Sequence, residues 1–140
     1  MAVMAKPSFV YIAWLIALAA TVGSLYFSEV MRLAPCLLCW YQRIFMYPLT
    51  FIIPIGILRQ DRGLALYVLP LSSIGVAIAL YHNLLYYRFI PEQFAPCRVG
   101  VSCTERAGEW FGFASIPFLS FTAFSAITIL MFLRAKRTAA

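Results

Sequence analysis

The sequence has little charge and few polar residues. Of its 140 residues, 11% are charged and 64% are apolar or aromatic. A soluble domain has about 25% charged residues, so this composition excludes a soluble enzyme and a disordered tail. The net charge of +6 does not indicate nucleic-acid binding, because the eleven cations are scattered among apolar runs and form no phosphate-tracking face. The composition predicts an integral membrane protein with the lipid bilayer as its surroundings and no nucleic-acid partner.

Four uncharged or nearly uncharged runs are long enough to cross a membrane. A spanning helix needs about 20 apolar residues, and the runs extend roughly over 8–28, 38–58, 64–87 and 112–133. Strands are not expected, since an open sheet edge in lipid leaves backbone groups unpaired. We therefore predict an all-α membrane protein, in which residues 1–140 form one domain folded as a four-transmembrane-helix bundle.

The distribution of cations sets the expected orientation. An even number of spans places both termini and the middle loop on one side, and this side has six Lys and Arg residues against five on the other. By the positive-inside rule, both termini are cytoplasmic and the loops 29–37 and 88–111 face outward. The run Ala17-Leu18-Ala19 resembles a signal-peptide cleavage site, but the apolar stretch continues to Phe27, which favours a retained first span.

The four cysteines fall in pairs, one in each outward loop. Cys36 and Cys39 form a C-x-x-C pair where the second span begins, and Cys97 and Cys103 are separated by five residues. A zinc site is one alternative, but the second spacing is unusual for it and the only histidine, His82, lies in the third span. A thioredoxin motif would need a soluble βαβ context, which the sequence lacks. A structural disulfide within C-x-x-C restrains little of the unfolded chain, so the pair favours thiol–disulfide exchange, and we expect no metal.

The surroundings of the first pair also favour exchange. Pro35 precedes it, and the positive end of the second helix is expected to stabilise a thiolate there. Arg43 follows Cys39 by four residues, which places both on one helix face. An arginine inside a membrane helix is a functional candidate, although snorkelling to headgroups or pairing with Glu29 is an alternative.

Exchange alone moves electrons only between sulfur pairs, so net oxidation needs another acceptor. The sequence has neither a glycine-rich nucleotide fingerprint nor a C-x-x-C-H haem motif. A membrane quinone remains by elimination.

The run Pro35-Cys36-Leu37-Leu38-Cys39-Trp40-Tyr41-Gln42-Arg43-Ile44 resembles the second-helix signature of the DsbB/BdbC family of disulfide bond formation proteins. The segment from Gly23 to Glu29 and the later run Cys103-Thr104-Glu105-Arg106, with Trp110-Phe111-Gly112 and Pro117, also resemble this family, especially its BdbC branch. The resemblance implies a disulfide-generating thiol:quinone oxidoreductase in the bacterial cytoplasmic membrane. Such a protein reoxidises an extracytoplasmic thioredoxin-fold thiol oxidase (DsbA/BdbD-like) and passes electrons to ubiquinone or menaquinone.

The resemblance also implies roles for the cysteines. Cys39 corresponds to the cysteine beside the quinone, with Arg43 next to that quinone and Cys36 as its C-x-x-C partner. Cys97 corresponds to the cysteine that the partner's thiolate attacks, and Cys103 to the one that relays to Cys36. The resting pairing stays open between two bridges within the loops and a bridge from Cys36 to Cys103.

Three points depart from this interpretation or compete with it. His82 lies near the position of a family histidine implicated in quinone binding, but a helix-packing role explains it equally well. Only residues 98–102 separate the second cysteine pair, far fewer than in proteobacterial members, so we expect a smaller relay movement. The rivals are a vitamin-K-epoxide-reductase-like enzyme, which the run from Trp40 to Arg43 disfavours, and a non-enzymatic protein stapled by disulfides.

Overall fold

The computed structural model describes residues 8–32, 37–94 and 116–139, and in this part of the chain every regular element is a helix. The elements are α1 (Ser8–Leu25), the π-helical turn η1 (Tyr26–Val30), α2 (Leu37–Leu58), α3 (Leu64–Tyr86), the 3-10 turn η2 (Glu92–Phe94) and α4 (Ile116–Ala139). Four helical segments, α1 extended through η1 and then α2, α3 and α4, are long and apolar enough to cross a membrane. The predicted all-α, four-span fold class is confirmed.

The fourth helix ends later than the sequence pattern suggested. It continues past residue 133 to Ala139, while residues 112–115 of the expected span lie outside the described residues. The reason is that Arg134, Lys136 and Arg137 end the apolar run without ending the helix. Lysine and arginine are good helix formers, and cations are favourable in a last helical turn.

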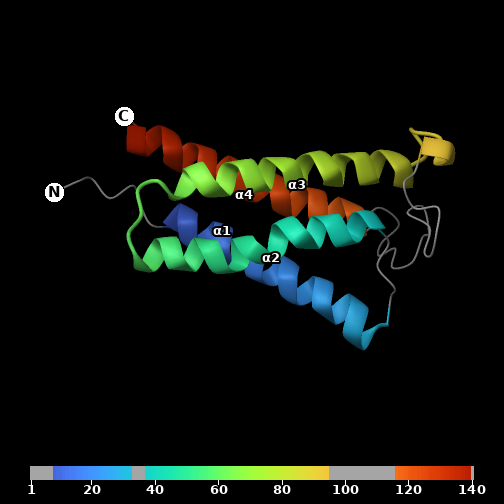
Figure 1. Ribbon diagram of the computed structural model, residues 1–140, viewed down its shortest axis with the longest axis horizontal. Helices are drawn as coiled ribbons and strands as arrows, with labels where there is room; N and C mark the ends of the chain where they lie inside the picture. The colour runs from blue at the N-terminus through green and yellow to red at the C-terminus, as the bar shows by residue number, and fades with distance from the viewer. Residues whose placement is uncertain (1–7, 33–36, 95–115, 140) are drawn as a thin grey trace.

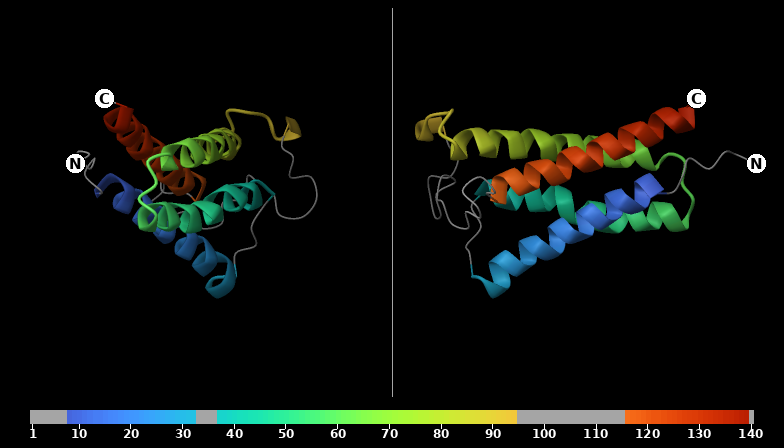
Figure 2. Two further views of the ribbon diagram at one scale, coloured as in Figure 1. Left: turned by 60° about the vertical axis from the view of Figure 1, so that its left-hand side comes forward. Right: turned by 180° about the vertical axis from the view of Figure 1, so that it is seen from behind.

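The four helices run alternately up and down, so that each packs against its neighbours in sequence and α4 closes against α1 (Figure 1). The start of α1, the end of α4 and the α2–α3 connection lie at one end of the bundle. The opposite end holds η1, the start of α2 and η2. Toward η1, α1 diverges from the other three helices, as two opposite views show (Figure 2). The candidate site lies at this open end.

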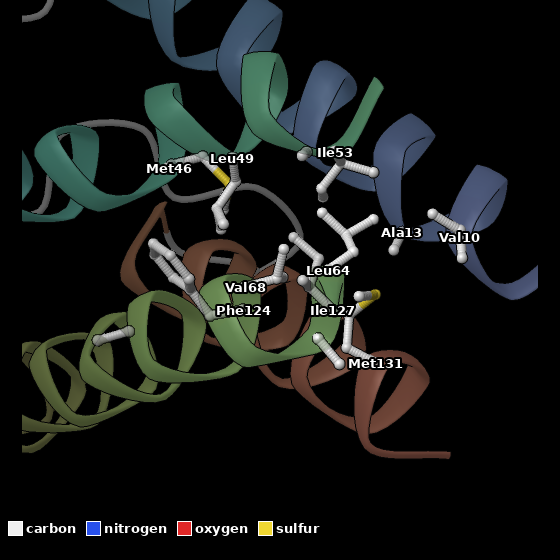
Figure 3. Packing of buried hydrophobic residues seen from close by; sticks show 13 residues of the cluster. Val10, Ala13, Met46, Leu49, Ile53, Leu64, Val68, Phe124, Ile127 and Met131 are labelled. Atoms are coloured by element: carbon white, nitrogen blue, oxygen red, sulfur yellow. The ribbon is translucent and has the colours of Figure 1, made fainter. Parts of the chain in front are cut away.

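The bundle core sits in the half nearer the α2–α3 connection, where side chains from all four helices meet (Figure 3). Fully buried members include Leu49, Val68 and Phe124. Small residues allow close approach, since a Cβ atom at Gly75 would overlap the ring of Phe124. In lipid, this packing replaces the hydrophobic effect as the main force between helices. The outward faces are apolar as well, and Leu58 is 84% exposed.

A hydrogen bond to a carbonyl that a proline has freed joins α1 to α2 in mid-span. Pro54 has no N–H, so the carbonyl of Thr50, four residues earlier, lacks its usual helical donor. The indole Nε1 of Trp14 donates to this carbonyl at 3.2 Å. The Thr50 hydroxyl also lies 2.8 Å from the hydroxyl of Thr21. Pro54 thus helps to determine how α1 packs.

Arg134 does more than anchor the chain end. Its Nη2 donates to the carbonyl of Asp61 at 2.9 Å, and the Asp61 carboxylate accepts from the Gly63 amide at 2.8 Å. The last turns of α4 therefore hold the α2–α3 turn in place.

Candidate functional site

Cys39 is the cysteine that the structure describes, and it lies in the first turn of α2. Its side chain is half-buried and packs against a small cluster built on Leu38 of α2 and Leu85 of α3. The first turn of a helix presents backbone N–H groups without intrahelical partners and the positive end of the helix dipole. Both features stabilise a thiolate at this position. The other three cysteines of the predicted redox site lie outside the described residues: Cys36, Cys97 and Cys103.

Arg43 extends from α2 toward α1, one turn further from the helix start than Cys39. Its Nη2 donates to the Ser24 carbonyl at 3.1 Å, and the guanidinium carbon lies 5.2 Å from the centroid of the Trp40 ring. Ser24 lies in the last turn of α1, just before the π-helical turn, and its carbonyl also accepts from the Ser28 hydroxyl. The predicted alternative partner, Glu29, forms no ion pair with Arg43 in the described structure. The cation is therefore fixed in direction, next to the turn that carries Cys39.

His82 belongs to α3 and lies inside the bundle, next to the side of α2 that faces α3. It is 2% exposed, and its Nδ1 is 2.9 Å from Nε2 of Gln42, which is 6% exposed. Consecutive residues of an α-helix point about 100° apart, so Gln42 faces α3 while Arg43 faces α1. The structure thus places Cys39 and Arg43 one turn apart on α2 and places His82 behind them.

Gln42 was not singled out from the sequence, although a signal existed. Burying an amide side chain in an apolar membrane span is expensive unless the amide has a hydrogen-bond partner. The same applies to Asn83, the residue after His82. Asn83 has found two acceptors: its Nδ2 donates to the carbonyls of Ala79 and Pro117, at 2.8 and 2.9 Å. This contact joins α3 to the start of α4.

The outer surface beside Arg43 is apolar and aromatic. Trp40 is 52% exposed, and its neighbours on α2, Leu37, Tyr41 and Ile44, are also exposed. A lipid-soluble ring approaching from the bilayer would therefore meet an aromatic face with a guanidinium against it. Trp110, named above in the run that resembles the family, lies outside the described residues.

The described part of the α3–α4 connection is tied to α3. The hydroxyl of Tyr81 donates to the Phe94 carbonyl at 2.7 Å, across η2. The Phe94 side chain itself is 67% exposed. Phe94 is therefore held by its backbone while its ring stays available, three residues before Cys97.

Taken together, the fold and the site define a multi-pass helical membrane protein with a cysteine at a helix start and an arginine one turn away. The family model described as "Disulfide bond formation protein DsbB" matches residues 6–134, and the chain belongs to this family. The family's members are oxidoreductases that act in disulfide bond formation, and such a role implies a thiol oxidase partner.

Curated relatives cover most of the chain. It is 49% identical over 126 residues to "Probable disulfide formation protein C" of Halalkalibacterium halodurans, covering 89% of this chain and 92% of that protein. It is 46% identical over 125 residues to "Disulfide bond formation protein C" of Bacillus subtilis, with 88% and 89% covered. A third relative, "Probable disulfide formation protein" of Metapseudomonas resinovorans, is 44% identical over 128 residues, with 91% and 89% covered. No solved structure matches the chain.

Proposed function

We propose that this protein is a thiol:quinone oxidoreductase that reoxidises a thioredoxin-fold thiol oxidase and passes the electrons to a membrane quinone, either ubiquinone or menaquinone. The observation that carries the proposal is the arrangement at the start of α2. There a half-buried Cys39 lies one turn from an Arg43 whose guanidinium is fixed between the Ser24 carbonyl and the Trp40 ring.

The residues present fit a quinone. Quinone oxygens accept hydrogen bonds, and a guanidinium has five N–H donors, of which one on Arg43 is directed to Ser24. The exposed face of Trp40 offers a flat apolar contact. A bound quinone would supply a two-electron, two-proton acceptor and would leave as quinol into the bilayer. His82, buried behind α2, supports the site rather than lining its lipid-facing side.

The chain's own contribution is to hold Cys39 as a thiolate. The helix start and the guanidinium both favour the ionised sulfur over the thiol. Arg43 also stabilises negative charge that develops next to this sulfur. Because Arg43 is anchored to α1, this stabilisation needs little reorganisation during the reaction.

The relay between the two cysteine pairs is part of the proposal. The partner's thiolate attacks Cys97 of a Cys97–Cys103 disulfide, forming a mixed disulfide and releasing the Cys103 thiolate. Cys103 then attacks Cys36 of a Cys36–Cys39 disulfide and releases the Cys39 thiolate. The partner's second thiol then attacks the mixed disulfide and releases the Cys97 thiolate. Cys97 attacks Cys103 and releases Cys36, so that the Cys97–Cys103 bond is restored and Cys36 and Cys39 are reduced by two electrons.

The charge distribution supports an outward-facing redox end. At the opposite end of the bundle, the described cations are Arg59, Arg62, Arg134, Lys136 and Arg137, with Asp61 as the acidic residue among them. By the positive-inside rule, that end is cytoplasmic. Cys39 and both cysteine-bearing loops then face the outside of the bacterial cytoplasmic membrane, where the thioredoxin-fold partner is found.

Cys97→Ser tests the relay. The variant should fail to oxidise a reduced thioredoxin-fold partner even when quinone is present. With dithiothreitol, which can reduce the Cys36–Cys39 bond directly, the same variant should still reduce quinone. Normal partner oxidation by Cys97→Ser would refute the relay order, and loss of both activities in well-folded protein would favour a structural role for the disulfides.

A further inference from the structure

The Gln42–His82 contact has no role in the relay, yet it is a buried polar pair whose Gln42 follows Cys39 by three residues. Both side chains are more than nine-tenths buried, and 2.9 Å separates Gln42 Nε2 from His82 Nδ1. His82 is the only histidine in the sequence. Polar side chains buried within membrane-spanning helices are expensive and usually functional.

The chemistry of the two nitrogens fixes the state of the ring. An amide nitrogen can only donate a hydrogen bond, so Nδ1 of His82 must be the acceptor. A neutral imidazole with an accepting Nδ1 carries its single proton on Nε2.

The pair lies next to the packing of Cys39. Gln42 follows Cys39 by three residues on α2, so the two side chains are neighbours along one side of the helix. Leu85 follows His82 by three residues on α3, and Leu85 belongs to the cluster against which Cys39 packs. Rotation of the first turns of α2 would therefore break the Gln42–His82 hydrogen bond and move Cys39 at the same time.

From this placement we propose that Gln42 is a positioning residue. Its amide holds the His82 ring in the tautomer protonated on Nε2, and the bond sets the rotation of the first turns of α2 against α3. Because Gln42 is directly followed by Arg43, the same rotation aims the guanidinium at Ser24 of α1. The effect on electron transfer rests on the proposed function, whereas the state of the ring does not.

Nitrogen-15 NMR of histidine-labelled protein in lipid nanodiscs reads the ring state directly, since one ring gives one pair of signals. The wild type should show an unprotonated Nδ1 and a protonated Nε2. In Gln42→Glu an ionised carboxylate can only accept, so Nδ1 should become protonated. Gln42→Met, which keeps the length but has no donor, should show a mixture of both tautomers.

Thr50→Val is the matched control, because Thr50 is a buried polar residue of α2 that contacts α1 instead of α3. Its histidine signals should equal those of the wild type. A protonated Nδ1 in the wild type, or signals that change in neither Gln42 variant, would overturn the assignment.

The functional part is tested by quinone reduction with dithiothreitol as reductant. Misplacing a reacting group by about 1 Å can cost up to 100-fold, so we expect kcat in Gln42→Met to fall by about tenfold or more, with Thr50→Val within about twofold of the wild type. An unchanged kcat in Gln42→Met, or an equal fall in Thr50→Val, would overturn the positioning role. An inactive wild type would instead refute the proposed function, while the NMR result would still decide the state of His82.

Discussion

The contact between Trp14 and the Thr50 carbonyl gives a sharp test of how α1 is held. Trp14→Phe keeps an aromatic ring at the position but removes the indole N–H, which donates at 3.2 Å to a carbonyl that Pro54 has left without its helical donor. Hydrogen bonds between membrane helices contribute about 1–2 kcal/mol in model peptides and about 0.6 kcal/mol on average in double-mutant cycles. We expect a loss toward the upper end, about 1–2 kcal/mol, because the carbonyl has no N–H at residue 54 to return to.

A double-mutant cycle separates this explanation from simple loss of packing. In Pro54→Ala, the new N–H of residue 54 can donate to the Thr50 carbonyl, so Trp14→Phe should then cost less than about 0.5 kcal/mol. Pro48→Ala is the matched control, because it restores a donor to the carbonyl of Ile44 and leaves that of Thr50 unchanged. The assay is equilibrium unfolding in mixed micelles. An equal cost of Trp14→Phe in the Pro54→Ala and Pro48→Ala backgrounds would show that Trp14 holds α1 by packing and not by this hydrogen bond.

Three further predictions concern the site, the core and the orientation. Arg43→Ala should lower kcat/KM for quinone by about 10- to 100-fold, the equivalent of one hydrogen bond to a charged group, and unchanged quinone kinetics would remove Arg43 from the site. Gly75→Ala should destabilise the bundle by about 1–3 kcal/mol because its methyl group meets the Phe124 ring, whereas Gly23→Ala, with nothing within 4 Å, should have little effect on unfolding in the same micelles. In a variant without the four native cysteines, an impermeant maleimide added to intact cells should label Phe89→Cys and not Gln60→Cys, both at exposed positions. The reverse labelling would invert the proposed orientation.

The four spans were predictable because their signal is one-dimensional: about 20 apolar residues between charges are enough to indicate a membrane helix. The same hydropathy signal could not predict where α4 ends. Hydropathy locates the edge of the membrane, whereas the helix continues through Arg134 and Lys136 because those residues are good helix formers.

The partners inside the site could not be predicted from the sequence. In these spans the lipid-facing and inward-facing sides are both apolar, so periodicity does not show which side of a helix meets which neighbour. The spacing of Cys39 and Arg43 follows from the sequence because both lie on one helix. The contacts of Arg43 with Ser24 and of Gln42 with His82 depend on how helices pack, and only the structure shows them.

Quinone reduction by the purified protein is the direct test of the proposed thiol:quinone activity. The wild type and Cys39→Ser would each be given a reduced thioredoxin-fold partner with ubiquinone and menaquinone analogues, and the quinone absorbance would be followed. We expect that the wild type reduces quinone and that Cys39→Ser does not, although the variant still forms a mixed disulfide with the partner at Cys97. Quinone reduction that persists in Cys39→Ser, or its absence in well-folded wild-type protein, would contradict the proposed activity.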